Sequence, residues 1–257
     1  MGTKRNRTVS RLARLATDFW GYFHLVSYAA THLRGLKRIP TRTVLYRQIY
    51  FTGIETIGRV VVIGLLIGIV LITQVASFGW CSPKTTGRIL VSTVVRELGG
   101  VLTAIIVIAR SGGAVAAELG AVKITRDAEH LRVLGIDPMQ YLILPRLLGI
   151  TVAVFVLSVY FQIAALFGGV VFSSVLAGLP FTQYMNAVVA AIHPLDVAVS
   201  LGKSMVFGLI IATVACYQGF NVKVSITEIP QASIRAVMQS LLLVFLFDGI
   251  ITLVAFL

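Results

Sequence analysis

The sequence predicts an all-α membrane protein with five transmembrane helices. Of its 257 residues, 57% are hydrophobic and 12% are charged, whereas about 25% of the residues in an ordinary soluble domain are charged. Apolar runs recur along the chain at the length of about 20 residues that a membrane span requires. The Lys and Arg residues mostly flank these runs, and ten of the 22 lie in residues 1–50.

Residues 1–50 are expected to form a basic N-terminal tail followed by interfacial amphipathic helices. Aromatic residues such as Trp20, Tyr22 and Tyr28 are interleaved there with Arg, Lys and His. This composition suits helices that lie in the membrane interface. A disordered basic tail is the alternative, and it fits residues 1–10 well. Residues 51–257 are expected to form one membrane domain.

The five spans are placed by the apolar runs within residues 51–257. The second span contains Arg96 and Glu97, the fourth contains Lys203 and the fifth contains Asp248. The uncharged run from Leu147 to Leu195 is too long for one helix, so it is divided into a span and an outer segment whose structure the sequence leaves open. The spans are expected at about 57–81, 89–110, 147–177, 199–222 and 236–257.

The distribution of Lys and Arg predicts the orientation of these spans. With the N-terminus in the cytoplasm, the inner segments 1–50, 110–146 and 223–235 carry ten, five and two basic residues. The outer segments 79–88 and 178–198 then carry two and none. Basic residues favour the cytoplasmic side, so the C-terminus is expected on the outer side. The same distribution accounts for the net charge of +12 without a nucleic-acid partner.

A short amphipathic helix is expected at 125–135, between the second and third spans on the cytoplasmic side. Thr125 can cap it, its acidic residues lie near the positive end of the helix, and Gly135 ends it. A plain connector would need no apolar face, so the helix is expected to dock, either on a partner protein or on its own membrane surface. The residues that carry this prediction are Thr125, Asp127, Glu129, Leu131, Arg132, Leu134 and Gly135.

Two sets of small residues recur at four-residue spacing. Gly112, Ala116 and Gly120 share one helix face, and Gly64 and Gly68 form a similar pair in the first span. Small faces let two membrane helices approach closely. Packing within the subunit and a special interface are equally compatible with this spacing.

Ionisable residues inside the spans are the strongest candidates for a functional site. Arg96 and Glu97 are near the outer part of their span, and so is Lys203 in its own. Each such side chain costs about 2.5–3.5 kcal/mol on insertion scales, so it normally faces a partner or a water-filled cavity. The three could line one polar pocket, and internal salt bridging for stability is the alternative.

Enzyme and metal motifs fail along the whole chain. Gly202, Lys203 and Ser204 match the end of a phosphate-binding loop, but Val197 stands where its first glycine is required. The four His residues have no mutual spacing for a metal, and neither Cys81 nor Cys216 belongs to a ligand motif. The chain is therefore not expected to be an enzyme or to bind a metal.

Residues 96–146, RELGGVLTAIIVIARSGGAVAAELGAVKITRDAEHLRVLGIDPMQYLILPR, resemble the MlaE/YrbE permease family of bacterial lipid-transport ABC systems. The shared pattern is R-E-L-G, A-R-S-G, A-E-L-G, a Thr-led acidic helix, L-G-I-D-P and P-R. Gly100 replaces a usual Pro, Ala109 replaces a usual Gly, and Arg126 occupies a position that is often acidic. The segment from Val222 to Ser240 also lacks the expected Gly- and Thr-rich run.

The resemblance implies half of a phospholipid transporter in the bacterial inner membrane, with its C-terminus in the periplasm. Two copies would pair, two cytoplasmic ATPase subunits would bind ATP, and a periplasmic MCE-domain protein would bind outside. The chain itself would need no cofactor. The helix at 125–135 would be the coupling helix, and the cavity between the permeases would lie near Arg96, Glu97, Lys203 and Arg235. A non-transporting membrane scaffold is the alternative function.

Overall fold

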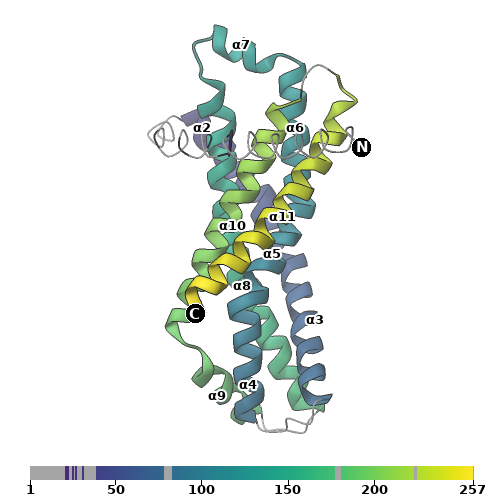
Figure 1. The fold of residues 1–257 in the computed structure, drawn as a ribbon, viewed down its shortest axis with the longest axis vertical. Helices are drawn as coiled ribbons and strands as arrows, with labels where there is room; N and C mark the ends of the chain where they lie inside the picture. Colours follow the sequence, from purple (N-terminus) through teal and green to yellow (C-terminus); the bar gives the residue numbers. More distant parts are fainter. Residues whose placement is uncertain are drawn as a thin grey trace, which may run out of the picture.

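In the computed structural model, residues 21, 22, 25, 27, 31, 39–77, 83–176, 181–222 and 225–256 are described, and their regular structure is entirely helical. Five helices in these ranges are long and apolar enough to cross a membrane. They are Thr43–Val75, Lys84–Ile124, Met139–Ser174, Pro194–Phe220 and Glu228–Ala255. The prediction of an all-α protein with five spans is confirmed (Figure 1).

The first span begins earlier than the sequence predicts. Helix α2 (Ile39–Ile49) continues through the π-helical turn η2 (Tyr50–Ile54) into α3 (Glu55–Ser77). The expected boundary at residue 50 therefore falls inside a continuous helix, because no proline interrupts it after Pro40. Most of the expected interfacial helices lie outside the described residues. Of the remainder, Tyr22 packs edge-to-face on Tyr217 and donates a 2.7 Å hydrogen bond to Gln239 Oε1.

The second span is the middle of a much longer rod. Helix α4 (Pro83–Val91), η3 (Ser92–Leu98), α5 (Gly99–Val107), η4 (Ile108–Gly112) and α6 (Gly113–Ile124) follow one another without a break. The 41 residues of this rod extend about 60 Å, twice the thickness of the hydrocarbon core. The helix extends beyond the expected span 89–110 because charged residues such as Arg110 end an apolar run without ending a helix.

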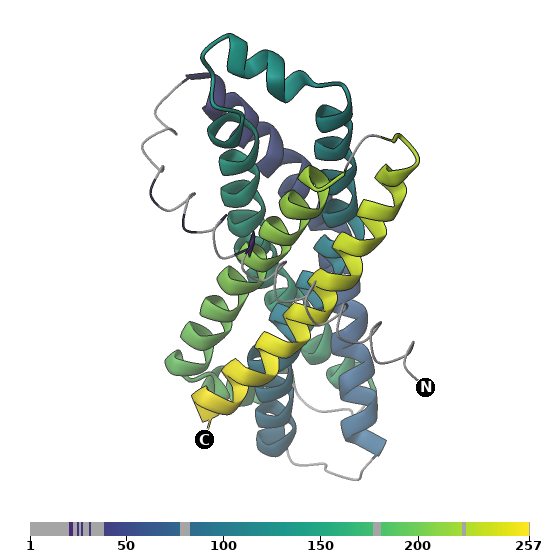
Figure 2. The same ribbon diagram turned by 45° about the horizontal axis from the view of Figure 1, so that its top comes forward.

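The remaining helices complete a long bundle. The short α7 (Asp127–Val133) leads through η5 (Met139–Ile143) into α8 (Leu144–Leu176), and α10 (Pro194–Phe220) and α11 (Glu228–Phe256) follow. The outer segment that the sequence left open is helical, as α9 (Phe181–Ala191). Figure 1 shows α7 at one end of the long axis and α4 with α9 at the other. In Figures 1 and 2, α11 crosses one side of the bundle obliquely.

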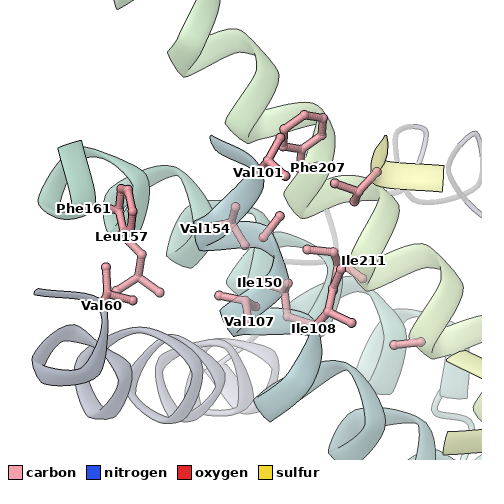
Figure 3. Close-up of a cluster of buried hydrophobic side chains, with 14 of the residues drawn as sticks. Val60, Val101, Val107, Ile108, Ile150, Val154, Leu157, Phe161, Phe207 and Ile211 are labelled. Carbon is pink, nitrogen blue, oxygen red and sulfur yellow. The ribbon is translucent and has the colours of Figure 1, made fainter. Parts of the chain in front are cut away.

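The buried core is built around α8. Figure 3 shows Leu157 and Phe161 of α8 beside Val60 of α3, and Phe207 and Ile211 of α10 on the other side of the cluster. All five side chains are fully buried. By contrast, α11 exposes a row of large apolar side chains, as expected of a surface that meets lipid or another subunit. The row includes Ile234, Met238, Leu242, Phe245, Leu246, Ile250, Leu253 and Val254.

The small residues singled out in the sequence lie at close helix crossings within the chain. A Cβ on Gly68 would lie 2.9 Å from both the carbonyl carbon of Ala165 and the amide nitrogen of Gly169. A Cβ on Gly64 would lie 2.9 Å from the carbonyl oxygen of Phe161. Glycine is therefore required for α3 to approach α8 this closely.

The second set of small residues faces α10. A Cβ on Gly219 would lie 2.8 Å from the carbonyl oxygen of Ala116, and one on Gly120 would lie 3.2 Å from Val222. Gly112 is looser, since its added Cβ would make only ordinary contact with Ile211, at 3.9 Å. Of the two possibilities that the spacing left open, the structure shows packing within the subunit.

Candidate functional site

Five charged side chains gather at membrane depth, and we name them the charge cluster: Arg96, Glu97, Asp196, Lys203 and Asp248. Arg96 and Glu97 come from η3, Asp196 and Lys203 from α10, and Asp248 from α11. In η3 the backbone is π-helical, and the Gly99 amide accordingly bonds to the carbonyl of Val94. Such turns are frequent at functional sites.

Lys203 is the centre of the charge cluster. Its Nζ donates to Asp248 Oδ1 at 3.0 Å, to Thr252 Oγ1 at 2.6 Å and to the carbonyl oxygen of Arg96 at 3.0 Å. Glu97 Oε2 lies 3.4 Å from the same nitrogen. The Lys203 side chain is 1% exposed. An ammonium group buried this deeply is tolerated only because acceptors surround it.

Arg96 is paired separately with Asp196. Its Nε lies 3.0 Å from Asp196 Oδ1, and one terminal nitrogen donates to Asp196 Oδ2 at 3.1 Å. The terminal nitrogen makes the hydrogen bond, and the Nε contact is an ion-pair contact without hydrogen-bond geometry. Asp196 was not among the predicted site residues, because it falls within the outer segment expected at 178–198. The sequence could have indicated that Asp196 belongs to a helix. Proline is typical of a helix start, as Pro194 is in α10, and an acidic residue favours the first turn.

The members of the charge cluster differ in exposure, and this divides their roles. The side chains of Arg96 and Glu97 are 36% and 40% exposed, whereas that of Asp248 is 16% exposed. Protein groups enclose the Lys203 ammonium within this single chain, and its place beside a cavity between two copies stays a prediction. Its long flexible stem lets it reach the carboxylates instead of open space. Arg96 and Glu97 are the members that can meet a ligand.

Arg235 does not join the charge cluster. It is exposed on α11, 13 residues before Asp248, which corresponds to about 20 Å along a helix. The structure therefore does not bring Arg235 together with Arg96, Glu97 and Lys203, and its role at the cavity stays a prediction. A match of residue type at a helix start carries no information about depth.

Helix α7 forms the end of the bundle opposite α4 and α9 (Figure 1). Asp127 and Glu129 lie in its first turn and Arg132 in its last. Gly135 ends the helix with φ 73°, and its amide bonds to Arg132 O at 3.0 Å while the Ile136 amide bonds to Leu131 O at 2.9 Å. This is the Schellman arrangement that favours glycine.

The cap predicted at Thr125 is wrong. The residue before α7 is Arg126, which has the left-handed φ of 58°. The Thr125 amide bonds to Ala121 O at 2.9 Å, so Thr125 ends α6, and its hydroxyl lies 2.6 Å from the Asp127 carboxylate. A left-handed residue between two helices makes the turn that the sequence analysis assigned to a capping hydroxyl.

The apolar face predicted for α7 is split between core and solvent. Leu131 is half-buried against the core, whereas Leu134 is 73% exposed and the neighbouring Val133 is 87% exposed. The tip of the molecule therefore presents two apolar side chains beside the acidic first turn of α7. A single exposed apolar side chain is ordinary on a protein surface, whereas adjacent exposed apolar side chains can mark a site where a partner docks.

Arg146 joins the two helices on either side of α7. Arg146 of α8 lies 2.9 Å from Glu118 of α6, and its NH1 donates to Leu142 O at 3.1 Å. The Arg146 side chain is 5% exposed. The two helices that lead into and out of α7 are thus joined by an ion pair near the ends that meet α7.

Arg110 of η4 joins the long rod to the first span. It pairs with Glu55, donates to Thr56, and stacks over the ring of Phe51 at 5.0 Å. Glu55 therefore takes part in a contact between helices. The motif residues Arg110, Glu118 and Arg146 therefore join helices in the half of the molecule that carries α7.

Comparison with known proteins agrees with this architecture. The model of the permease MlaE family matches residues 45–254. A probable ABC transporter permease protein of Synechocystis is 33% identical over 81% of this chain and 80% of its own. The chloroplastic protein TRIGALACTOSYLDIACYLGLYCEROL 1 of Arabidopsis thaliana is 30% identical over 86% of this chain and 63% of its own.

A third relative carries a more specific description. The intermembrane phospholipid transport system permease protein MlaE of Haemophilus influenzae is 26% identical over 83% of this chain and of its own. The family match includes all five spans, the charge cluster and α7. The chain therefore belongs to the MlaE family of permeases, as the motifs between residues 96 and 146 predicted.

Proposed function

We propose that this protein is the transmembrane permease subunit of an ABC transporter that moves phospholipid between the bacterial inner membrane and a periplasmic MCE-domain partner. Two copies pair, and separate cytoplasmic ATPase subunits bind and hydrolyse ATP. The chain itself holds no cofactor in this proposal. The carrying observation is the charge cluster, in which Arg96 and Glu97 are partly exposed beside the enclosed Lys203.

A phospholipid fits the chemistry of this region. Its head group is polar and requires partners at membrane depth, and η3 offers the charges of Arg96 and Glu97 there. Its acyl chains require apolar surface, and α11, which carries Asp248, exposes Leu242, Phe245 and Leu253. A scaffold without transport would gain little from keeping five charged groups in the membrane.

The ATPase subunits are proposed to act through α7. Two apolar side chains and an acidic first turn lie at its exposed tip, and the Glu118–Arg146 pair links the helices on either side. Movement of α7 is then transmitted to α6 and α8 together. Since α6 continues through α5 into η3, the same rod leads to the charge cluster.

The test is phospholipid transport by the complete complex reconstituted in vesicles. We expect Glu97→Ala to lower ATP-dependent transfer of a labelled phospholipid to the MCE partner, while the subunits still co-purify. The matched control is Glu228→Ala, which removes a carboxylate at the cytoplasmic start of α11. Normal transfer by the Glu97 variant would refute the assignment of the lipid site, and no transfer by the unaltered complex would refute the function.

A further inference from the structure

The charge cluster contains more carboxylates than cations. Its cations are Arg96 and Lys203, and its carboxylates are Glu97, Asp196 and Asp248. Asp196 accepts both contacts from the Arg96 guanidinium. One lysine therefore faces two carboxylates, and the cluster carries one surplus negative charge.

Over the described residues, the helices that pack around the charge cluster carry no further Lys or Arg within two helical turns of its members. The next basic residue on the second rod is Arg88, eight residues before Arg96, which is about 12 Å along a helix. Arg110 and Arg235 are still farther along their helices, and His193, three residues before Asp196, is exposed. Beyond Arg146 near its cytoplasmic start, α8 carries no charged residue.

Glu97 is the carboxylate that lacks compensation. Asp248 receives the Lys203 ammonium at 3.0 Å and is 16% exposed. Glu97 is 3.4 Å from the same nitrogen, its contacts with the Thr252 hydroxyl are 3.2 and 3.3 Å, and it is 40% exposed. These are the longer contacts, so Asp248 holds the lysine and Glu97 keeps its acceptor capacity.

A surplus carboxylate at membrane depth is costly unless a cation meets it. Among phospholipids, the cation is the ammonium group of a zwitterionic head group. We propose, resting on the function proposed above, that Glu97 receives this ammonium group, so that the permease prefers amine-bearing phospholipids over anionic ones. A primary ammonium fits best, because it adds charge-assisted hydrogen bonds to the pairing.

The test is a competition within the reconstituted complex. Donor vesicles contain equal amounts of phosphatidylethanolamine and phosphatidylglycerol with identical acyl chains, and the lipid recovered on the MCE partner is quantified by mass spectrometry. We expect phosphatidylethanolamine to be enriched several-fold. Phosphatidylethanolamine with an acetylated amine keeps the head group but loses its positive charge, so it should be recovered no better than phosphatidylglycerol.

Two variants test the assignment to Glu97. Glu97→Gln keeps the side-chain shape but removes the charge, and we expect it to abolish the enrichment, because the charge-assisted hydrogen bond to the ammonium group is lost. Asp248→Asn leaves Glu97 intact but leaves Lys203 with one carboxylate, so it should also reduce the enrichment. Because Asp248→Asn changes the charge balance without altering Glu97, a loss of enrichment in this variant would tie the lipid preference to the surplus negative charge.

The outcomes are distinct. Equal recovery of the two lipids by the unaltered complex would overturn the inference but leave the transport function intact. An equal loss of both lipids in Glu97→Gln, with the ratio unchanged, would overturn it as well, because Glu97 would then act without regard to head-group charge. Absence of any ATP-dependent transfer by the unaltered complex would instead overturn the proposed function.

Discussion

Lys203 shows how a single buried charge is maintained inside a membrane helix. Its ammonium has four partners: the Arg96 carbonyl, Thr252, Asp248 and the more distant Glu97. Each partner lies on another helix, so the residue joins η3, α10 and α11. A buried pair need not stabilise a protein relative to apolar residues, but removal of one partner leaves the other uncompensated.

Lys203→Met should therefore destabilise the protein by about 3–5 kcal/mol, because Asp248 is left buried without its cation. Thermal unfolding of the purified protein in detergent measures this loss. Arg235→Met is the matched control, since Arg235 is exposed and its replacement should change stability by no more than about 0.5 kcal/mol. The double variant Lys203→Met, Asp248→Leu should recover part of the loss. A single variant as stable as the unaltered protein would show that the pair is not coupled.

At the scale of helices, glycine determines how closely α3 and α8 approach. Gly64 and Gly68 of α3 face Phe161, Ala165 and Gly169 of α8, where an added Cβ would meet backbone atoms. Membrane helices gain little from apolar burial alone, since lipid is as apolar as the facing helix. Close backbone approach therefore contributes a large share of the packing.

Gly68→Ala should separate α3 from α8 and destabilise the protein by about 1–3 kcal/mol, the usual cost of overpacking. Gly58→Ala on the same helix is the control, because an added Cβ there would have nothing within 4 Å. It should be neutral or gain up to about 1 kcal/mol from better helix propensity. Unfolding in detergent compares the two variants, and equal effects would contradict the packing argument.

Helix α7 is the second element whose role depends on its placement. Simultaneous charge reversal, Asp127→Lys with Glu129→Lys, should loosen co-purification of the ATPase subunit, because it removes the acidic first turn of the exposed tip. Lys123→Glu, an exposed charge change of opposite sign at the end of α6, is the control. Unchanged recovery of the ATPase with the reversed helix would argue against the docking role.

At the scale of the whole molecule, a chain with two specialised ends crosses the membrane five times. The α7 tip and the paired α4 and α9 lie at opposite ends of the bundle (Figure 1). Basic residues are concentrated on the segments that join the α7 side, so that side is predicted to be cytoplasmic. The α4–α9 end is then the periplasmic end, where an outer partner would bind.

Cysteine labelling tests this orientation. In a variant with Cys81→Ser and Cys216→Ser, Lys84→Cys should react with a membrane-impermeant maleimide on spheroplasts, whereas Val133→Cys should react only after the membrane is opened. Both positions are exposed, so access rather than burial decides the result. The reverse pattern would invert the predicted topology.

Much of the candidate site was predictable, since each charge in an apolar run stands out against its neighbours. Arg96, Glu97 and Lys203 were found in this way, and the structure brings them together with Asp248. Asp196 was missed because it lies at the edge of a run, where a charge is unremarkable. The enclosure of Lys203 and the separation of Arg235 depend on which way a side chain points and on depth, which spacing does not encode.

The sequence by itself determined the class of fold, the number of spans and the family, because these follow from apolar length and from motifs read along one chain. Only the tertiary structure decided which charges pair and which helices the glycines of α3 and α6 face. It also decided that α2, α4 and α6 continue the spans. These outcomes depend on contacts between segments about a hundred residues apart, such as Arg96 with Asp196 and Glu97 with Lys203. A local pattern shows that a buried charge needs a partner, but only packing selects the partner.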